Sequence, residues 1–161
     1  MAGVGSRTEA DAIADLERWF SRLRTGTYKV TSAYDRKYNC AAFAAGQTDT
    51  WWEPAPDGYW PPGVPSEYTV DAYAAAYGSI GFVECDTATS ERGFEKIAIY
   101  GDNGDFVHAA RQLPSGVWTS KLGRAEDIEH ETLQQLEGNG QWEYRFVVKF
   151  MKRRWTTKAD G

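Results

Sequence analysis

The sequence has few cysteines and histidines, two of each among 161 residues, and it has no long apolar run. Two cysteines cannot supply the disulfide framework of a small secreted domain. Two cysteines and two histidines at these spacings match no zinc-ligand pattern, so we expect neither a metal nor another cofactor. Because no signal-peptide pattern and no transmembrane segment is visible, we expect a cytoplasmic protein with free thiols, with delivery as an effector left open.

An excess of positive charge is also missing, since the formal net charge is −5 and the sequence pI is about 5.1. This balance argues against a nucleic-acid partner, and nothing in the pattern points to a membrane partner. The one basic run, at residues 152–154, falls at the end of the chain. We expect residues 1–7 and 153–161 to be disordered tails around a single domain that is large enough to bury a core.

Hydrophobic periodicity predicts helices first and strands second. A helix should begin after Thr8, a short one at Cys40 and another after Thr69, each preceded by an N-capping residue type. Three strands should then form an antiparallel meander, with Asn103-Gly104 as a hairpin turn. A helix over 124–136 and a last strand over 142–150 complete an α+β domain.

Aromatic residues are abundant where proline is also concentrated. Seven tryptophans and nine tyrosines are present, and the stretch 47–67 holds five prolines, which exclude a helix or a central strand. We predict a long ordered loop there, with Trp51, Trp52 and Trp60 as a wall for a substrate or ligand.

Cys40 is the candidate nucleophile. It lies at the start of a short Ala-rich helix with Asn39 as the N-cap, and the unpaired N–H groups of a helix start favour a thiolate. The same N–H groups, with Asn39 nearby, are the expected oxyanion donors. The alternative is a small buried core residue, which is the interpretation that we favour for Cys85.

His108 is the candidate base, because it is predicted on the middle strand of the meander. Either Gln112 or Ser120 is expected to orient its imidazole. Lys121 follows Ser120 in a turn that approaches the expected cleft. His130 is expected on the surface of the predicted C-terminal helix, beside acidic residues.

The segment Lys96-Ile97-Ala98-Ile99-Tyr100-Gly101-Asp102-Asn103-Gly104-Asp105-Phe106-Val107-His108-Ala109 resembles the strand-turn-strand signature of NlpC-type peptidases, members of the papain-like superfamily. In that family the first His of the signature is the base and the second orients it. The resemblance implies a papain-like fold and hydrolysis or transfer of an acyl group. Lys96 stands at the first position and His108 at the second, and Asn39-Cys40 differs from the usual Asp-Cys-Ser/Thr-Gly.

The role of Lys96 depends on the hairpin register. A two-residue turn at Asn103-Gly104 places Lys96 and His108 on opposite faces of the sheet, whereas a three-residue loop places them together. Lys96 is then either a solvent-facing residue at a strand start or a cation that holds a thiolate or a substrate carboxylate.

Two functions follow as hypotheses. The first is a cysteine hydrolase or acyltransferase that attacks an amide or ester bond through a Cys40 thioacyl intermediate, with a peptide, an amide-containing molecule or another small acyl compound as substrate. A toxin or effector domain would share this chemistry. The second is a catalytically inactive papain-like binding module that uses the loop around residues 51–60 to hold a peptide, a sugar or a partner protein.

Overall fold

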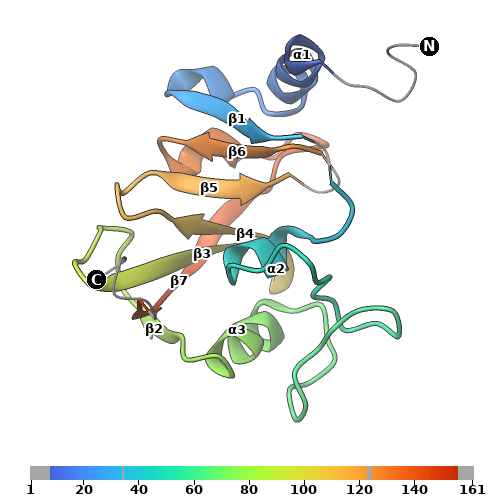
Figure 1. Ribbon diagram of the computed structural model, residues 1–161, viewed down its shortest axis with the longest axis vertical. Coiled ribbons are helices and arrows are strands. Elements are labelled where there is room, and N and C mark those ends of the chain that lie inside the picture. Colours follow the sequence, from blue (N-terminus) through green and yellow to red (C-terminus); the bar gives the residue numbers. More distant parts are fainter. Residues whose placement is uncertain (1–7, 34, 123–124, 156–161) are drawn as a thin grey trace.

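The computed structural model describes residues 8–33, 35–122 and 125–155. It has helices and a seven-stranded antiparallel sheet, which confirms the α+β class (Figure 1). The strand order is β1-β6-β5-β4-β3-β7-β2. The strands are β1 Tyr28–Ser32, β2 Val83–Cys85, β3 Phe94–Asp102, β4 Asp105–Gln112, β5 Trp118–Lys121, β6 Asp127–His130 and β7 Phe146–Arg154.

The helices begin where the capping residues predict. Helix α1 (Glu9–Trp19) follows Thr8, whose hydroxyl accepts from the Asp11 N–H in a capping box. Helix α2 (Cys40–Ala44) follows Asn39, and α3 (Val70–Gly78) follows Thr69. Two short 3-10 helices, η1 (Leu23–Thr25) and η2 (Leu133–Leu136), complete the set. Among the described residues, none of the helices has the length and apolar character needed to cross a membrane.

The sheet is buried on both faces. Helices α2 and α3 pack on the face that carries Ile97, Ile99 and Ala109, which we call the α2 face. Helix α1, η1 and η2 pack on the face that carries Ala98, Tyr100 and Ala110, which we call the α1 face. Successive residues of a strand point to opposite faces, so neighbouring positions on β4 serve two different cores.

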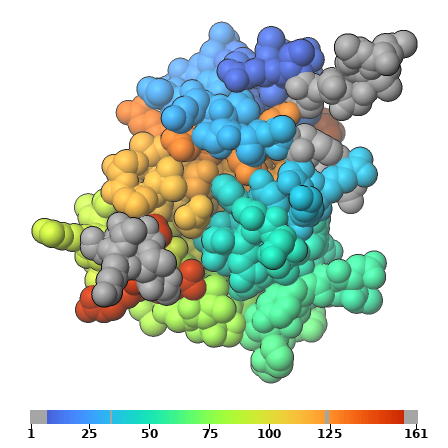
Figure 2. All heavy atoms as spheres, viewed as in Figure 1, coloured from blue at the N-terminus to red at the C-terminus, as the bar shows by residue number. Residues whose placement is uncertain are grey.

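Residues 47–67 form the expected long ordered loop, which we call the aromatic loop. It leaves α2, projects at the lower right of the molecule and returns to α3 (Figures 1 and 2). Its inner anchor is Trp52, which is fully buried and stacks on Tyr77 of α3 with ring centroids 5.5 Å apart. Trp52 also contacts Tyr59 of the loop, with ring centroids 5.6 Å apart, so the loop packs both on α3 and on its own aromatic residues.

One predicted helix was wrong, and one strand was not predicted. Residues 124–136 do not form a helix within their described part, because Asp127–His130 pair as strand β6 between β1 and β5, and only 133–136 turn as η2. Ile128, Leu133 and Leu136 were expected to form the inward side of a helix and all three are buried, but tertiary strand pairing decided the structure. Residues Tyr28–Ser32, for which no strand was predicted, form β1 at one edge of the sheet.

The basic C-terminal run is structured rather than disordered. Arg153 and Arg154 end β7, and the Trp155 N–H donates to the Gly93 carbonyl. Arg153 is held by Glu95, at 2.8 Å between Nε and Oε2. Residues 1–7 and 156–161, the rest of the predicted tails, lie outside the described residues.

A β-bulge resolves the register of the β3–β4 hairpin. The turn has two residues, Asn103 and Gly104, both with positive φ, and Asp102 pairs with Asp105. The register then shifts, so that Gly101 pairs with Phe106 but Tyr100 pairs with His108. The bulge places Lys96 and His108 on the same α1 face in spite of the two-residue turn.

Candidate functional site

Cys40 begins helix α2 and lies on the α2 face. Asn39 caps this helix through its side-chain oxygen, which accepts from the Ala42 N–H at 3.1 Å. The same side chain binds the backbone of Trp52, accepting from its N–H at 3.1 Å and donating to its carbonyl at 2.7 Å. Asn39 thus ties the aromatic loop to α2.

The surroundings of the Cys40 thiol keep it protonated. Burial raises the pKa of Cys40 to about 11, although the N–H groups of Ala109 and Ala41 and the charge of Lys121 oppose the rise. A nucleophilic cysteine needs the opposite shift. Cys40 and Cys85 are both free thiols of intermediate exposure.

His108 belongs to a buried hydrogen-bonded chain of side chains on the α1 face, which we call the histidine chain: His108, Ser120 and His130. The Ser120 Oγ lies 3.0 Å from His108 Nε2 and 2.8 Å from His130 Nε2. His130 Nδ1 lies 2.9 Å from the Thr132 carbonyl oxygen. The three side chains come from three adjacent strands, β4, β5 and β6.

The Thr132 carbonyl at one end of the histidine chain determines which atom donates in each of its hydrogen bonds. A carbonyl can only accept, so His130 donates from Nδ1 and accepts at Nε2 from the Ser120 hydroxyl. The Ser120 oxygen then accepts from the His108 Nε2–H. Burial lowers the pKa of His130 to about 4 and the pKa of His108 well below its ordinary value, so both rings are neutral at pH 7.

The structure does not bring His108 and Cys40 together. Ala109 packs against α2, whereas His108, one residue earlier, stacks on Tyr144 with ring centroids 4.2 Å apart on the α1 face. The sheet itself lies between the imidazole and the thiol. His130, expected on a helix surface, is instead a fully buried strand residue.

The other residues predicted for the reaction have structural partners. Gln112 donates to the Ala88 carbonyl at 2.8 Å, so of the two expected orienters only Ser120 is bonded to His108. Lys96 is fully buried and pairs with Glu91 at 3.1 Å, rather than with a thiolate.

Lys121 does lie on the same face as Cys40, in a small polar cluster. Its Nζ donates to the Ala125 carbonyl at 2.6 Å and lies 5.1 Å from the centre of the Tyr38 ring. Tyr38 in turn donates a hydrogen bond to Asp127, the cross-strand partner of Lys121. The cluster pairs opposite charges around the start of α2 and supplies no imidazole.

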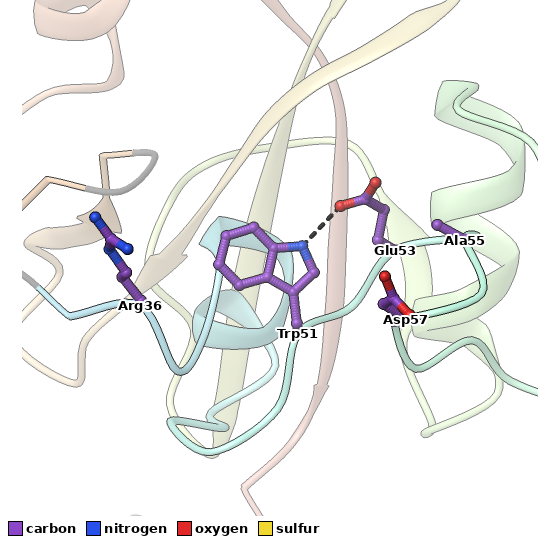
Figure 3. A pocket seen from close by; sticks show the side chains of 6 residues that line it. Arg36, Trp51, Glu53, Ala55 and Asp57 are labelled. Carbon is purple, nitrogen blue, oxygen red and sulfur yellow. Dashed lines mark hydrogen bonds between the residues drawn. The ribbon is translucent and has the colours of Figure 1, made fainter.

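An open cavity of about 410 Å³ lies at the base of the aromatic loop (Figure 3). Its lining is Arg36, Trp51, Glu53, Ala55, Asp57 and Gly58. A volume of this size is typical of small-ligand sites. Of the three tryptophans predicted to form a binding wall, only Trp51 lines this cavity.

Backbone hydrogen bonds fix the shape of the loop around the cavity. The Tyr59 N–H donates to the Trp51 carbonyl at 2.7 Å, and the Glu53 N–H donates to the Tyr59 carbonyl at 3.0 Å. A Cβ on Gly58 would lie 2.6 Å from the Glu53 carbonyl oxygen, so only glycine lets the chain close this tightly. The cavity is thus preformed.

The other two tryptophans pack against the α2-face core, with Trp52 fully buried and Trp60 partly buried. Trp52 is a core residue, and its Nε1 donates to Gln47. Trp60 meets Tyr73 edge-on, with ring centroids 4.9 Å apart, and donates to the Pro65 carbonyl.

The charged lining residues, Arg36, Glu53 and Asp57, were not predicted. The available signal was the presence of carboxylates and Asp57-Gly58 inside a loop already identified as a binding wall. Arg36 comes from the segment before α2, and no local pattern links it to the loop. Within the described ranges, no three His, Cys, Asp or Glu side chains are grouped so that they could hold a metal ion.

The comparison with protein families gives a match over most of the chain. The family described as "Domain of unknown function (DUF7689)" matches residues 29–152, which is more than half of the chain. No curated protein and no solved structure matches the chain.

Proposed function

The chain belongs to the DUF7689 family, and we propose that this member is a ligand-binding module of papain-like ancestry, in which the aromatic loop holds the ligand and Cys40 performs no chemistry. The binding site is the Trp51 cavity, which we define by its six lining residues.

The single observation that carries this proposal is the preformed cavity itself. It combines one large aromatic ring with charged groups of both signs around an open volume of about 410 Å³. Aromatic rings supply contact area at a low entropic cost, and a few fixed polar groups supply specificity. The loop also has its own buried anchor in Trp52, so ligand contact does not have to order it first.

The hydrolase hypothesis receives less support from the geometry. It needs a thiolate beside a base, and the base must lie within hydrogen-bond reach of the thiol or be linked to it by one water. Cys40 is held as a thiol by burial, and His108 faces the other side of the sheet. The lysine at the first position of the NlpC-like segment agrees with a fold that lost this chemistry.

NMR of the labelled full chain tests the proposal. A panel of tripeptides, monosaccharides and disaccharides is added while amide and indole N–H shifts are recorded. We expect at least one class to shift the Trp51 indole and the Gly58 amide, with the Ser120 amide unchanged. Shifts that centre on Cys40, or hydrolysis of a tripeptide that a Cys40→Ala variant no longer performs, would overturn the proposal.

A further inference from the structure

The charges around the Trp51 cavity are separated by sign. Figure 3 shows Arg36 on one side of the Trp51 ring and Glu53 and Asp57 on the other. The six-membered ring of the indole points toward Arg36, and its N–H points toward Glu53. The cavity therefore has a cationic end, an aromatic middle and an anionic end.

Glu53 makes the anionic end permanent. Its two carboxylate oxygens accept from the Trp51 indole N–H at 2.7 Å and from the Tyr68 hydroxyl at 2.6 Å. These hydrogen bonds lower the pKa of Glu53, so the carboxylate is charged at neutral pH. Each oxygen keeps a second lone pair, and Asp57 adds another carboxylate on the same side. This end is suited to an ammonium group.

Trp51 forms a fixed aromatic floor between the two ends. Because its indole N–H is bonded to Glu53, the ring cannot rotate without breaking that bond. A ring face attracts methylene groups by dispersion and attracts a nearby cation electrostatically. The floor therefore favours a flexible aliphatic segment that carries a cation toward Glu53.

Arg36 makes the opposite end suited to a carboxylate. Its guanidinium has five N–H donors in a planar fork that matches a carboxylate in two-bond geometry. Arg36 already interacts with a neighbour in the protein, and the fork has donors enough for a further acceptor.

We propose that the Trp51 cavity binds a zwitterion whose carboxylate and ammonium are joined by an aliphatic chain, which in a protein partner is a carboxyl-terminal lysine. The carboxylate binds Arg36, the methylenes lie on Trp51, and the ammonium meets Glu53 and Asp57. This inference rests on the proposed function, because it names the ligand class of the same cavity.

Three small probes of matched length test the assignment: 6-aminohexanoate carries both charges, hexylamine only the cation and hexanoate only the anion. Titrations of the full chain are followed through the Trp51 indole N–H and the Gly58 amide. We expect 6-aminohexanoate to bind about tenfold more tightly than either single-charge probe, which corresponds to one additional charge-assisted contact.

Two substitutions measure separately how much the cationic end and the anionic end of the cavity contribute to the affinity. Arg36→Gln should reduce 6-aminohexanoate to the affinity of hexylamine, and Asp57→Asn should weaken hexylamine while leaving hexanoate unchanged. Glu67→Gln is the matched control, because Glu67 is an exposed acid of the same loop outside the cavity lining, and it should change none of the three affinities.

Each alternative outcome decides the matter. Hexylamine or hexanoate binding as tightly as 6-aminohexanoate overturns the two-ended assignment, and so does an unchanged affinity in both Arg36→Gln and Asp57→Asn. If all three probes fail while a tripeptide or sugar shifts the loop, the zwitterion assignment is wrong and the binding module stands. If nothing shifts the loop, both are wrong.

Discussion

The histidine chain and the Trp51 cavity are two polar regions with opposite relations to solvent. In the histidine chain, His108, Ser120 and His130 are all buried and bonded to one another. In the cavity, the charged groups line an open volume. The residue types of the first region are those of catalytic sites, and those of the second are ordinary surface types. The two regions therefore differ in whether their polar groups are enclosed by the protein or line an open volume.

The largest expected difference in the free energy of unfolding is between alanine variants of the adjacent residues Trp51 and Trp52. Trp52→Ala removes a fully buried ring stacked on Tyr77 and should lower the free energy of unfolding by about 3–5 kcal/mol. Trp51→Ala removes a partly exposed cavity wall and should cost about 1 kcal/mol. Urea unfolding of both variants measures the contrast. Similar losses for the two would mean that the Trp51 ring is a core element and that the cavity is incidental.

The second largest expected effect is a loss of stability at acid pH that comes from the histidine chain. The pKa of His130 is lowered to about 4 in the folded protein, whereas an unfolded histidine titrates near pH 6.5. Between these values the unfolded chain binds more protons, so the free energy of unfolding decreases as the pH falls from about 6.5 to about 4. His130 alone should account for roughly 3 kcal/mol of this loss, and full stability is present above pH 6.5.

The control for this pH dependence is His130→Gln, whose amide can still donate to Thr132 and accept from Ser120. It keeps every carboxylate that also titrates in this range, so the difference between the two proteins isolates the imidazole. The expected result is a shallower loss of stability between pH 6.5 and pH 4 in the variant. Equal slopes would show that His130 binds the same number of protons in the folded and the unfolded state over this pH range.

Removing the hydroxyl in the middle of the chain should have a smaller effect. Ser120→Ala leaves the Nε2 atoms of two buried imidazoles without their partner and should cost about 2 kcal/mol. Ser66→Ala makes the same chemical change at an exposed site and should cost less than about 0.5 kcal/mol. Urea unfolding at pH 7 compares them. If Ser120→Ala behaves like Ser66→Ala, the hydrogen-bonded chain does not stabilise the fold.

The elements that depend on local signals could be predicted from the sequence, whereas those that depend on long-range pairing could not. Capping residues predicted α1, α2 and α3 correctly, because a cap acts on its own next turn. The β3–β4 hairpin and the α+β class also followed from local turn chemistry and periodicity. Strand β6 did not, because its partner β1 is remote in sequence and the apolar residues Ile128, Leu133 and Leu136 were expected to form the inward face of a helix.

The candidate site was harder to predict because sheet faces are sensitive to single-residue shifts. The sequence placed Cys40 at a helix start and His108 on the middle strand of the meander, and both positions hold. Which face each side chain occupies depends on the bulge beside Tyr100 and on the docking of α2 against Ala109. Neither has a local signal. The cavity likewise depends on Arg36, from the segment before α2, lining the same volume as residues of the aromatic loop.

The alkylation rate of Cys40 distinguishes a reactive thiolate from a packed thiol. With its pKa raised to about 11, Cys40 should react slowly with iodoacetamide at pH 7, and its rate should keep rising with pH beyond pH 9. Cys85, the other free thiol, serves as the internal reference when both sites are followed by peptide mass spectrometry. His108→Gln should leave the Cys40 rate unchanged, because the imidazole lies on the α1 face. Fast reaction at pH 7 that disappears in His108→Gln would instead establish a thiolate–imidazole pair and restore the hydrolase over the binding module.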